Sequence, residues 1–334
     1  NNTALWKASR VPSDSCLLRV THLNERSGNI EPILRIEGRG YFEAAVSPDG
    51  TKVVGSEMTG RPGSRATRPR VVLYDAVTGD SIKELGPGEK LLFSKDGSVL
   101  LTWDQHDIRA YDMNTLEQLW IIDPQRGILN CDISNDGSVA LVAGQALDTT
   151  RVVDGRTGEL ISIIPRASQN IQWADLSADG SRVATSDIDS SASVFDASTG
   201  DRLMTISEPN GRRFYRVVLS PTNNVLATTG SHGTAALWDA ETGDLMKEVS
   251  MRRYVNDNTY LAFSDDGSKL AVEAGTDQTR IVEVETGEPL VSMRRRSDVG
   301  GATSAGFFSD GATMFVNVLT KISLFDSESG VQIG

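Results

Sequence analysis

A short turn motif recurs eight times along the 334-residue chain, and its spacing constrains the fold more than any other feature. In most copies an apolar segment ends in an aromatic or aliphatic residue and an acid, and the turn that follows closes on Thr-Gly or Ser-Gly. The closing positions are Gly28, Gly79, Leu116, Gly158, Gly200, Gly243, Gly287 and Gly330. The first interval is 51 residues, and the later ones run from 37 to 44 residues. A repeat of about 43 residues predicts a modular array of similar supersecondary units.

A second polar turn recurs in phase with the first and divides each unit into strands. It is Asp-Gly in six units and Asn-Asn in one: Asp49-Gly50, Asp96-Gly97, Asp136-Gly137, Asp179-Gly180, Asn223-Asn224, Asp266-Gly267 and Asp310-Gly311. Because Gly, Asn and Asp tolerate the positive φ of two-residue connections, these pairs predict hairpin turns. In the unit that holds Asp179, residues 171–176, 182–185, 191–195 and 202–206 predict four antiparallel strands, a to d. No helical period persists, so we expect almost no helix.

Repeated four-stranded units favour an architecture in which each sheet packs on the next. One unit carries a more specific motif, in which Gly230-Ser231-His232-Gly233-Thr234 leads into Leu237-Trp238-Asp239. Across its whole length the chain resembles the WD-repeat β-propellers, which implies an all-β propeller fold. The other units replace Trp-Asp by Leu23-Asn24, Tyr74-Asp75, Tyr111-Asp112, Val153-Asp154, Phe195-Asp196, Val282-Glu283 and Phe325-Asp326. The family's Gly-His pair is missing throughout, so we expect its His-to-Asp network to be absent and aliphatic packing to hold the strands.

Counting the units predicts a propeller of eight four-stranded blades. Complete units cover about 37–87, 88–123, 124–165, 166–207, 208–250, 251–293 and 294–334. Residues 1–36 supply only strands b, c and d, at 4–8, 16–23 and 30–36, so the first blade lacks its innermost strand. Seven blades with these three strands packed outside the ring are the alternative.

Domain organisation follows from the same count. Because propeller repeats share a continuous core, we expect a single domain over 1–334. An open ring would leave two sheet edges exposed. The missing strand and the N-terminal Asn1 therefore predict that the chain is a segment of a longer protein.

Composition excludes several classes of function. A net charge of -12 argues against general nucleic-acid binding, because phosphate contacts need a basic footprint. No stretch approaches the ~20 apolar residues of a membrane span, which predicts a soluble chain without a span. The compartment stays open, with the cytoplasm slightly preferred. Cys16 and Cys131 are too few for a disulfide framework or a zinc site and are predicted to be core thiols.

The distribution of charge indicates two different faces. In a propeller the a-to-b and c-to-d turns lie on one face, which should be negative here. Its acids include Asp80, Glu159, Asp201, Glu241, Asp244, Glu285, Glu288 and Glu328. Arginines and aromatic residues, Tyr41 and Phe214 among them, gather on the opposite face, in the d-to-a connections and in the long b-to-c loop of the second unit. The candidate partner-binding residues there are Arg61, Arg65, Arg68, Arg70, Arg212, Arg213, Tyr215, Arg252, Arg253, Tyr254, Arg294, Arg295 and Arg296.

These arginines and tyrosines have two interpretations. Arg and Tyr are enriched at binding hot spots, because planar donors and rigid rings give directional contacts at low entropic cost. In the alternative, each Arg is a solvated loop residue beside its own acid, such as Asp257 or Asp298. The insertion at 59–69, with two Gly and two Pro, is either a basic loop that orders on contact or a tolerated surface insertion.

Enzymatic alternatives come from the resemblance, since propellers also include lactonases, hydrolases and quinoproteins that work at a central channel. A His-based metal site would need His106 and His232 together with a carboxylate from Asp104, Asp107 or Asp187, and the remaining histidine is His22. Trp103 and Trp173 are candidates for the channel mouth or for wedges between blades. The chain lacks Gly-x-Ser-x-Gly, His-Glu-x-x-His and Gly-x-x-x-x-Gly-Lys. We therefore expect no catalytic, cofactor or metal site, and no enzymatic activity.

The sequence thus favours a non-catalytic interaction scaffold that binds an acidic or phosphorylated protein segment. The partner is either a separate protein or peptide or another domain of the same polypeptide. A propeller enzyme using the central channel and a sensor domain of a multidomain signalling protein are the alternatives.

Overall fold

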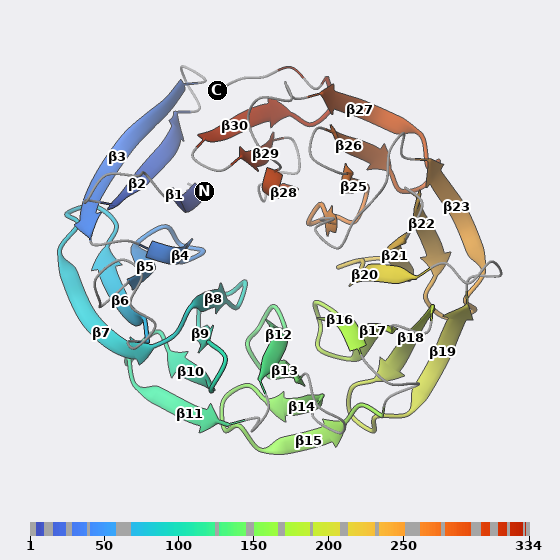
Figure 1. Ribbon diagram of the computed structural model, residues 1–334, viewed down its shortest axis with the longest axis horizontal. Helices are drawn as coiled ribbons and strands as arrows, with labels where there is room; N and C mark the ends of the chain where they lie inside the picture. Colours follow the sequence, from blue (N-terminus) through green and yellow to red (C-terminus); the bar gives the residue numbers. More distant parts are fainter. Residues whose placement is uncertain are drawn as a thin grey trace. The chain divides into compact units, whose positions relative to one another are not determined.

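The structure is a computed structural model in which every regular element is a β-strand (Figure 1). It describes residues 5–9, 16–24, 29–38, 41–57, 68–123, 127–144, 150–165, 171–187, 190–207, 213–230, 234–250, 261–274, 278–294, 302–307, 313–318, 321–329 and 331. No helix occurs in these ranges, which confirms the all-β prediction for them. Within the same ranges there is accordingly no helix that could cross a membrane.

The strands form eight sheets, and hydrogen-bonded neighbours within each sheet are consecutive in sequence. The first sheet contains β1 (Leu5–Ser9), β2 (Cys16–Asn24) and β3 (Asn29–Gly38). The second contains β4 (Tyr41–Val46), β5 (Lys52–Glu57), β6 (Arg70–Asp75) and β7 (Ser81–Pro87). The third contains β8 (Lys90–Phe93), β9 (Val99–Trp103), β10 (Ile108–Asp112) and β11 (Gln118–Ile122). The fourth contains β12 (Ile128–Ile133), β13 (Val139–Gly144), β14 (Arg151–Asp154) and β15 (Leu160–Ile163).

The later sheets repeat this pattern. The fifth contains β16 (Ile171–Leu176), β17 (Arg182–Asp187), β18 (Ser191–Asp196) and β19 (Arg202–Ser207). The sixth contains β20 (Phe214–Leu219), β21 (Val225–Gly230), β22 (Thr234–Asp239) and β23 (Leu245–Ser250). The seventh contains β24 (Leu261–Phe263), β25 (Lys269–Ala274), β26 (Gln278–Glu283) and β27 (Pro289–Arg294). The eighth contains β28 (Ala302–Phe307), β29 (Thr313–Val318) and β30 (Lys321–Asp326).

Six sheets therefore have four antiparallel strands and two have three. In the fifth sheet the four predicted strands are confirmed, each to within two residues. The prediction that residues 1–36 supply three strands is also confirmed. For the eighth unit, three of the four predicted strands lie in the described residues. The fourth would begin after Gly330, where only Val331 is described.

The chain divides into two compact units, which are described separately. Unit 1 comprises Asn1–Ala140 with Val153–Glu159, and unit 2 comprises Leu141–Val152 with Leu160–Gly334. The first three sheets belong to unit 1 and the last four to unit 2, while strands of the fourth sheet contribute to both.

The Asp-Gly turns are closed by a Ser-x-Asp-Gly-Ser/Thr hydrogen-bond pattern. Asp136 Oδ1 accepts hydrogen bonds from Ser134 Oγ at 2.7 Å, from the Ser138 N–H at 3.0 Å and from Ser138 Oγ at 2.7 Å. Asp49, Asp96, Asp179 and Asp266 repeat the arrangement. The Ser138 side chain, its N–H and Ser134 stabilise the carboxylate and lower the pKa of Asp136 to about 2. The turn motif is therefore a five-residue signature rather than the Asp-Gly pair alone.

The Thr-Gly turns end in glycine for two separate reasons. Gly200 has φ 78°, which L side chains rarely adopt, and a Cβ there would lie 2.5 Å from the carbonyl oxygen of Ile163. Gly158 has φ 74°, and a Cβ there would lie 2.7 Å from the Trp120 ring. Each turn thus packs against the fourth strand of the preceding sheet. Leu116 occupies the same position at φ 61°, and its carbonyl accepts a hydrogen bond from Lys83 Nζ.

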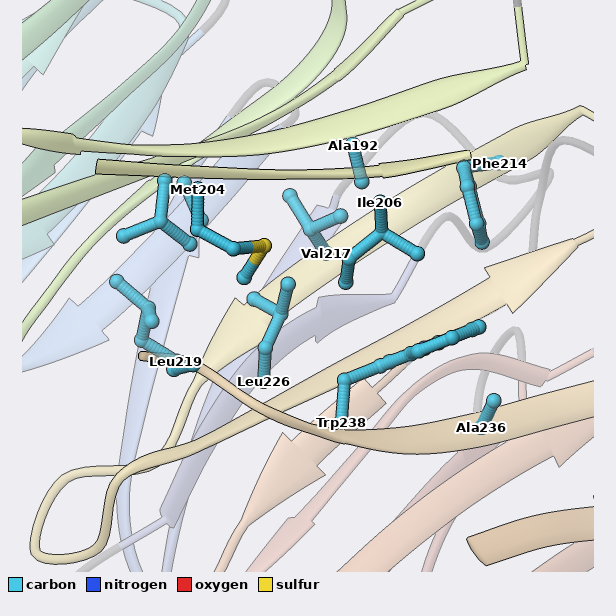
Figure 2. Packing of buried hydrophobic residues seen from close by; sticks show 12 residues of the cluster. Ala192, Met204, Ile206, Phe214, Val217, Leu219, Leu226, Ala236 and Trp238 are labelled. Atoms are coloured by element: carbon cyan, nitrogen blue, oxygen red, sulfur yellow. The ribbon is translucent and has the colours of Figure 1, made fainter. Parts of the chain in front are cut away.

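Apolar side chains between successive sheets form the core, as a cluster in unit 2 illustrates (Figure 2). Met204 and Ile206 of the fifth sheet pack with Phe214 and Leu226 of the sixth. The Trp238 ring meets Phe214 edge-on, with centroids 6.2 Å apart at 82°. Second and third strands are largely buried, whereas fourth strands are largely exposed, because the fourth strand lies at the edge of its sheet.

Candidate functional site

The structure describes five of the candidate partner-binding residues. Arg68, Arg70, Arg213 and Tyr215 are described with their side chains, and Arg294 is the last residue of β27. The remaining predictions lie outside the described residues: Arg61, Arg65, Arg212, Arg252, Arg253, Tyr254, Arg295 and Arg296. The described candidates therefore fall into two regions, one in each unit.

In unit 1, Arg68 is held by two buried aspartates from the β9–β10 loop. Its Nε donates to Asp104 Oδ2 at 2.7 Å, and its Nη2 lies 2.9 Å from Asp107 Oδ2. The side chains of Asp104 and Asp107 are 3% and 12% exposed. Asp104 Oδ1 also accepts the His106 N–H at 2.8 Å. Arg68 is thus fixed by groups of its own chain.

The charges of this cluster stabilise one another. Burial acts to raise the pKa of Asp104, but hydrogen bonds from Arg68 and the His106 N–H, with the positive charge of Arg68, outweigh it. The pKa of Asp104 therefore lies below the ordinary Asp value of 3.8. Burial acts to lower the pKa of Arg68, and Asp104 and Asp107 reverse this effect, so the pKa of the guanidinium is raised. Both groups are charged at neutral pH.

The same cluster contacts the end of β7. Arg109 shares Asp107, with Nη2 at 3.1 Å from Oδ2, and its Nη1 donates to the Pro87 carbonyl at 3.2 Å. Tyr111 Oη donates to the Leu85 carbonyl at 2.6 Å, and burial raises the pKa of its phenol. Hydrogen bonds and ion pairs thereby join the β5–β6 loop, the β9–β10 loop and the end of β7.

Arg70 closes the base of the β5–β6 loop. It lies opposite Glu57 in the strand register, and its Nε and Nη2 both donate to Glu57 Oε2, at 3.0 and 2.9 Å. Its Nη1 donates to Glu84 Oε2 at 3.3 Å. Both described arginines of this loop therefore pair with carboxylates of unit 1.

In unit 2 the start of β20 is anchored by a buried aromatic residue. Phe214 is 1% exposed and packs on Trp238, whose Nε1 donates to Thr228 Oγ1 at 2.8 Å. A Cβ on Gly230 would approach the Arg213 carbonyl to 3.0 Å, so the small residue allows the chain to enter β20 at this point. The anchor places Arg213 at the surface, where it is exposed.

The residues after Phe214 form an arginine–aromatic group. Arg216 Cζ lies 3.9 Å from the centroid of the Trp173 ring, which is close enough for a cation–π contact. Both side chains are half-buried, and Trp173 packs against the apolar cluster between the fifth and sixth sheets. Tyr215 is half-buried against the next cluster. We call Arg213, Tyr215, Arg216 and Trp173 the β20 group.

The residues considered for catalysis do not come together in the described part of the chain. His106 is exposed, and Arg68 and Arg109 occupy the carboxylates of Asp104 and Asp107. Within the described ranges no three His, Cys, Asp or Glu side chains are placed to hold a metal ion. Cys131 is a buried free thiol, as predicted, and burial raises its pKa. His232 lies outside the described residues.

Sequence reasoning missed two arginines, Arg109 and Arg216. Both lie inside strands, where isolated charges are ordinarily interpreted as solvent-facing. Two signals were available. Asp107 lies two residues before Arg109, and the run from Arg212 to Arg216 consists of three arginines and two aromatic residues. Trp173 could not be connected to Arg216 by spacing, because they come from different sheets.

No family model matches the chain, and no curated protein is significantly similar to it.

Proposed function

We propose that the protein is a non-catalytic interaction module that binds an acidic or phosphorylated protein segment through the β20 group. The observation that supports this most is the guanidinium of Arg216 over the Trp173 ring at 3.9 Å. Stacking restrains the guanidinium before a ligand arrives, so less side-chain entropy is lost on binding. Its in-plane N–H groups suit bidentate contacts to a carboxylate or phosphate.

Neighbouring residues make the group a suitable anchor point. Arg213 is exposed and adds a second positive charge at the start of β20. Tyr215 packs toward the seventh sheet and contributes a rigid amphipathic ring on the other face of β20. Arg, Tyr and Trp are the residue types most enriched among binding hot spots. A ligand of Arg68 or Arg70 would have to displace Asp104, Asp107 or Glu57 from them.

The proposal includes the fold in which this group would be displayed. We propose a WD-repeat-type β-propeller of eight blades whose first blade lacks its innermost strand, with seven blades and three additional strands as the alternative. Six four-stranded sheets with the same two turn motifs support it. In such a propeller the β20 group would lie at the d-to-a and b-to-c face.

The test measures binding of a fluorescein-labelled poly-glutamate peptide and of a phosphoserine-containing counterpart by anisotropy. The double variant Arg213→Glu/Arg216→Gln should weaken binding at least about tenfold, roughly 1.4 kcal/mol, because two cationic contacts are lost. Arg202→Glu provides two of the three units of charge change of the double variant at an exposed site on β19, and it should change affinity by less than about twofold. If both variants lose the same affinity, the loss reflects net charge and not the β20 group, which would contradict the proposal.

A further inference from the structure

A second surface, separate from the β20 group, lies on the edge strand β15. Three of its four residues are large aliphatic side chains with high exposure: Leu160 at 56%, Ile161 at 39% and Ile163 at 46%. The strand carries no charged residue. Charged side chains on edge strands normally discourage strand addition. Four of the other fourth strands carry such charges, as in Lys83 and Glu84 of β7 and Lys247 and Glu248 of β23.

The hydrogen-bond pattern directs part of the β15 backbone toward this edge. β15 is the last strand of its sheet in the described residues, and the Ile164 N–H donates to the Thr150 carbonyl at 3.0 Å. Since backbone directions alternate along an antiparallel pair, the adjacent Ile163 directs its N–H and C=O groups away from β14. The edge can therefore accept backbone hydrogen bonds beside the exposed isoleucines.

One end of the edge is bounded by the turn between β18 and β19. Ser162 Oγ donates to the Ala197 carbonyl at 2.6 Å, and a Cβ on Gly200 would lie 2.5 Å from the Ile163 oxygen. The turn thus covers Ile163 O, while the Ile161 side chain is 39% exposed. Because the turn packs directly on β15, its charges border the apolar patch.

The charges within the turn are negative. Asp196 and Asp201 are the only charged residues in the turn, and hydrogen bonds from Ser198 and from the Thr199 and Ser198 N–H groups lower the pKa of Asp196. Asp201 is exposed, as is Glu159 directly before β15. The net charge of the chain is -12. An apolar edge with an acidic border is complementary to a segment that carries both aliphatic and basic side chains.

We propose that β15 and the Asp196–Asp201 turn bind an extended peptide segment in which aliphatic and basic residues alternate. Its backbone pairs with the edge of β15, its aliphatic side chains cover Ile161 and Ile163, and its Lys or Arg residues face Asp201 and Glu159. The charge preference is opposite to that of the β20 group, and the residues are different. This inference therefore does not depend on the proposed function.

The test uses a labelled synthetic peptide of alternating Leu and Lys and, as its counterpart, a peptide of alternating Leu and Glu. Ile163→Lys should weaken binding of the Leu-Lys peptide at least about tenfold, because it removes an apolar contact and adds a like charge. Asp201→Asn should weaken it about threefold, with a smaller effect at high salt. Leu245→Lys, at a 52% exposed position on β23 beside Lys247 and Glu248, is the matched control and should leave affinity unchanged. Unchanged thermal unfolding midpoints show that the exposed substitutions preserve the fold.

Three results would overturn the proposal. Equal weakening by Leu245→Lys would indicate nonspecific adsorption, and comparable binding of the Leu-Glu peptide would remove the charge argument. The third result would come from sedimentation velocity. If the protein self-associates and Ile163→Lys abolishes the association, a second copy of the chain covers β15.

Discussion

Two arginine-containing regions of the molecule use the same residue type in different ways. In unit 1, Arg68 and Arg109 share Asp107, and Arg68 also pairs with the buried Asp104. In unit 2, Arg216 lies over Trp173 beside the exposed Arg213. The first region satisfies its cations with its own carboxylates, whereas the second holds one of them against an aromatic ring.

We propose that this difference separates a structural role in unit 1 from a binding role in unit 2. A buried carboxylate makes an arginine costly to remove and costly to redirect to a ligand. An aromatic ring restrains the guanidinium plane without neutralising its charge. A cluster of arginines in the sequence therefore does not define one site, and the groups that surround each guanidinium decide its role.

The largest expected effect is on stability in unit 1. Asp104→Ala should lower the free energy of unfolding by about 3 kcal/mol, because it leaves Arg68 without its buried partner. Urea denaturation measures the change. Asp80→Ala, an exposed acid on a turn of the same unit, should cost less than about 0.5 kcal/mol. Similar losses in both variants would mean that the Arg68 cluster is not structurally important.

A smaller effect distinguishes the two regions in binding. Arg216→Gln should weaken binding of the poly-glutamate peptide about fivefold while leaving the unfolding midpoint nearly unchanged. Arg68→Gln should do the reverse, with a clear loss of stability and less than about twofold change in affinity, since Arg68 already has carboxylate partners. Anisotropy and urea denaturation on the same two preparations provide both values. A larger loss of peptide affinity in Arg68→Gln than in Arg216→Gln would contradict the distinction between the two regions.

The contribution of the Arg68 cluster to the free energy of unfolding should decrease as the pH falls. The pKa of Asp104 is lower in the folded state than the ordinary 3.8, so its contribution to stability is fully present above pH ~4 and is lost as pH falls through the folded pKa. Asp136 and Asp266 behave in the same way, with pKa values of about 2, one in each unit. The free energy of unfolding should therefore fall between pH ~5 and pH ~2, and less steeply in Asp104→Asn. If the free energy of unfolding of Asp104→Asn depends on pH as steeply as that of the wild type, Asp104 does not contribute to the loss of stability in acid.

The smallest expected effect concerns the exposed end of the Arg70 pair. The side chains of Arg70 and Glu84 are 48% and 57% exposed, and exposed ion pairs contribute little. Glu84→Gln should change the free energy of unfolding by less than about 0.5 kcal/mol. Glu57 is 8% exposed and accepts two donors from Arg70, so Glu57→Gln should cost more, about 2 kcal/mol. Reversal of this order would contradict the assignment of Glu57 as the structural partner.

Much of the fold could be predicted from the sequence because turn chemistry repeats. Asp-Gly and Thr-Gly positions marked the strand ends, and the predicted strands of the fifth sheet match β16 to β19 closely. The serines that complete the first turn and the close contact that requires Gly200 were not predicted. The first needs hydrogen-bond geometry, and the second depends on Ile163 in a different sheet.

The candidate site was predicted only in part, for a related reason. Loop position identified Arg68 and Arg213 equally, because sequence spacing does not show which guanidinium faces a buried carboxylate. The stacking of Arg216 on Trp173 joins residues 43 positions apart on two sheets. The exposed apolar edge of β15 was not predicted either, because its Leu-Ile-Ser-Ile sequence resembles that of a buried strand.

The central claim is that the β20 group, and not the Arg68 cluster, contacts an anionic partner. Arginine footprinting with a phenylglyoxal reagent, read by mass spectrometry with and without the phosphoserine peptide, tests it most directly. The account predicts that Arg213 and Arg216 become protected when the peptide is bound, while modification of Arg68 and Arg70 stays unchanged. Protection of Arg68 or Arg70 without protection of Arg213 and Arg216 would contradict it.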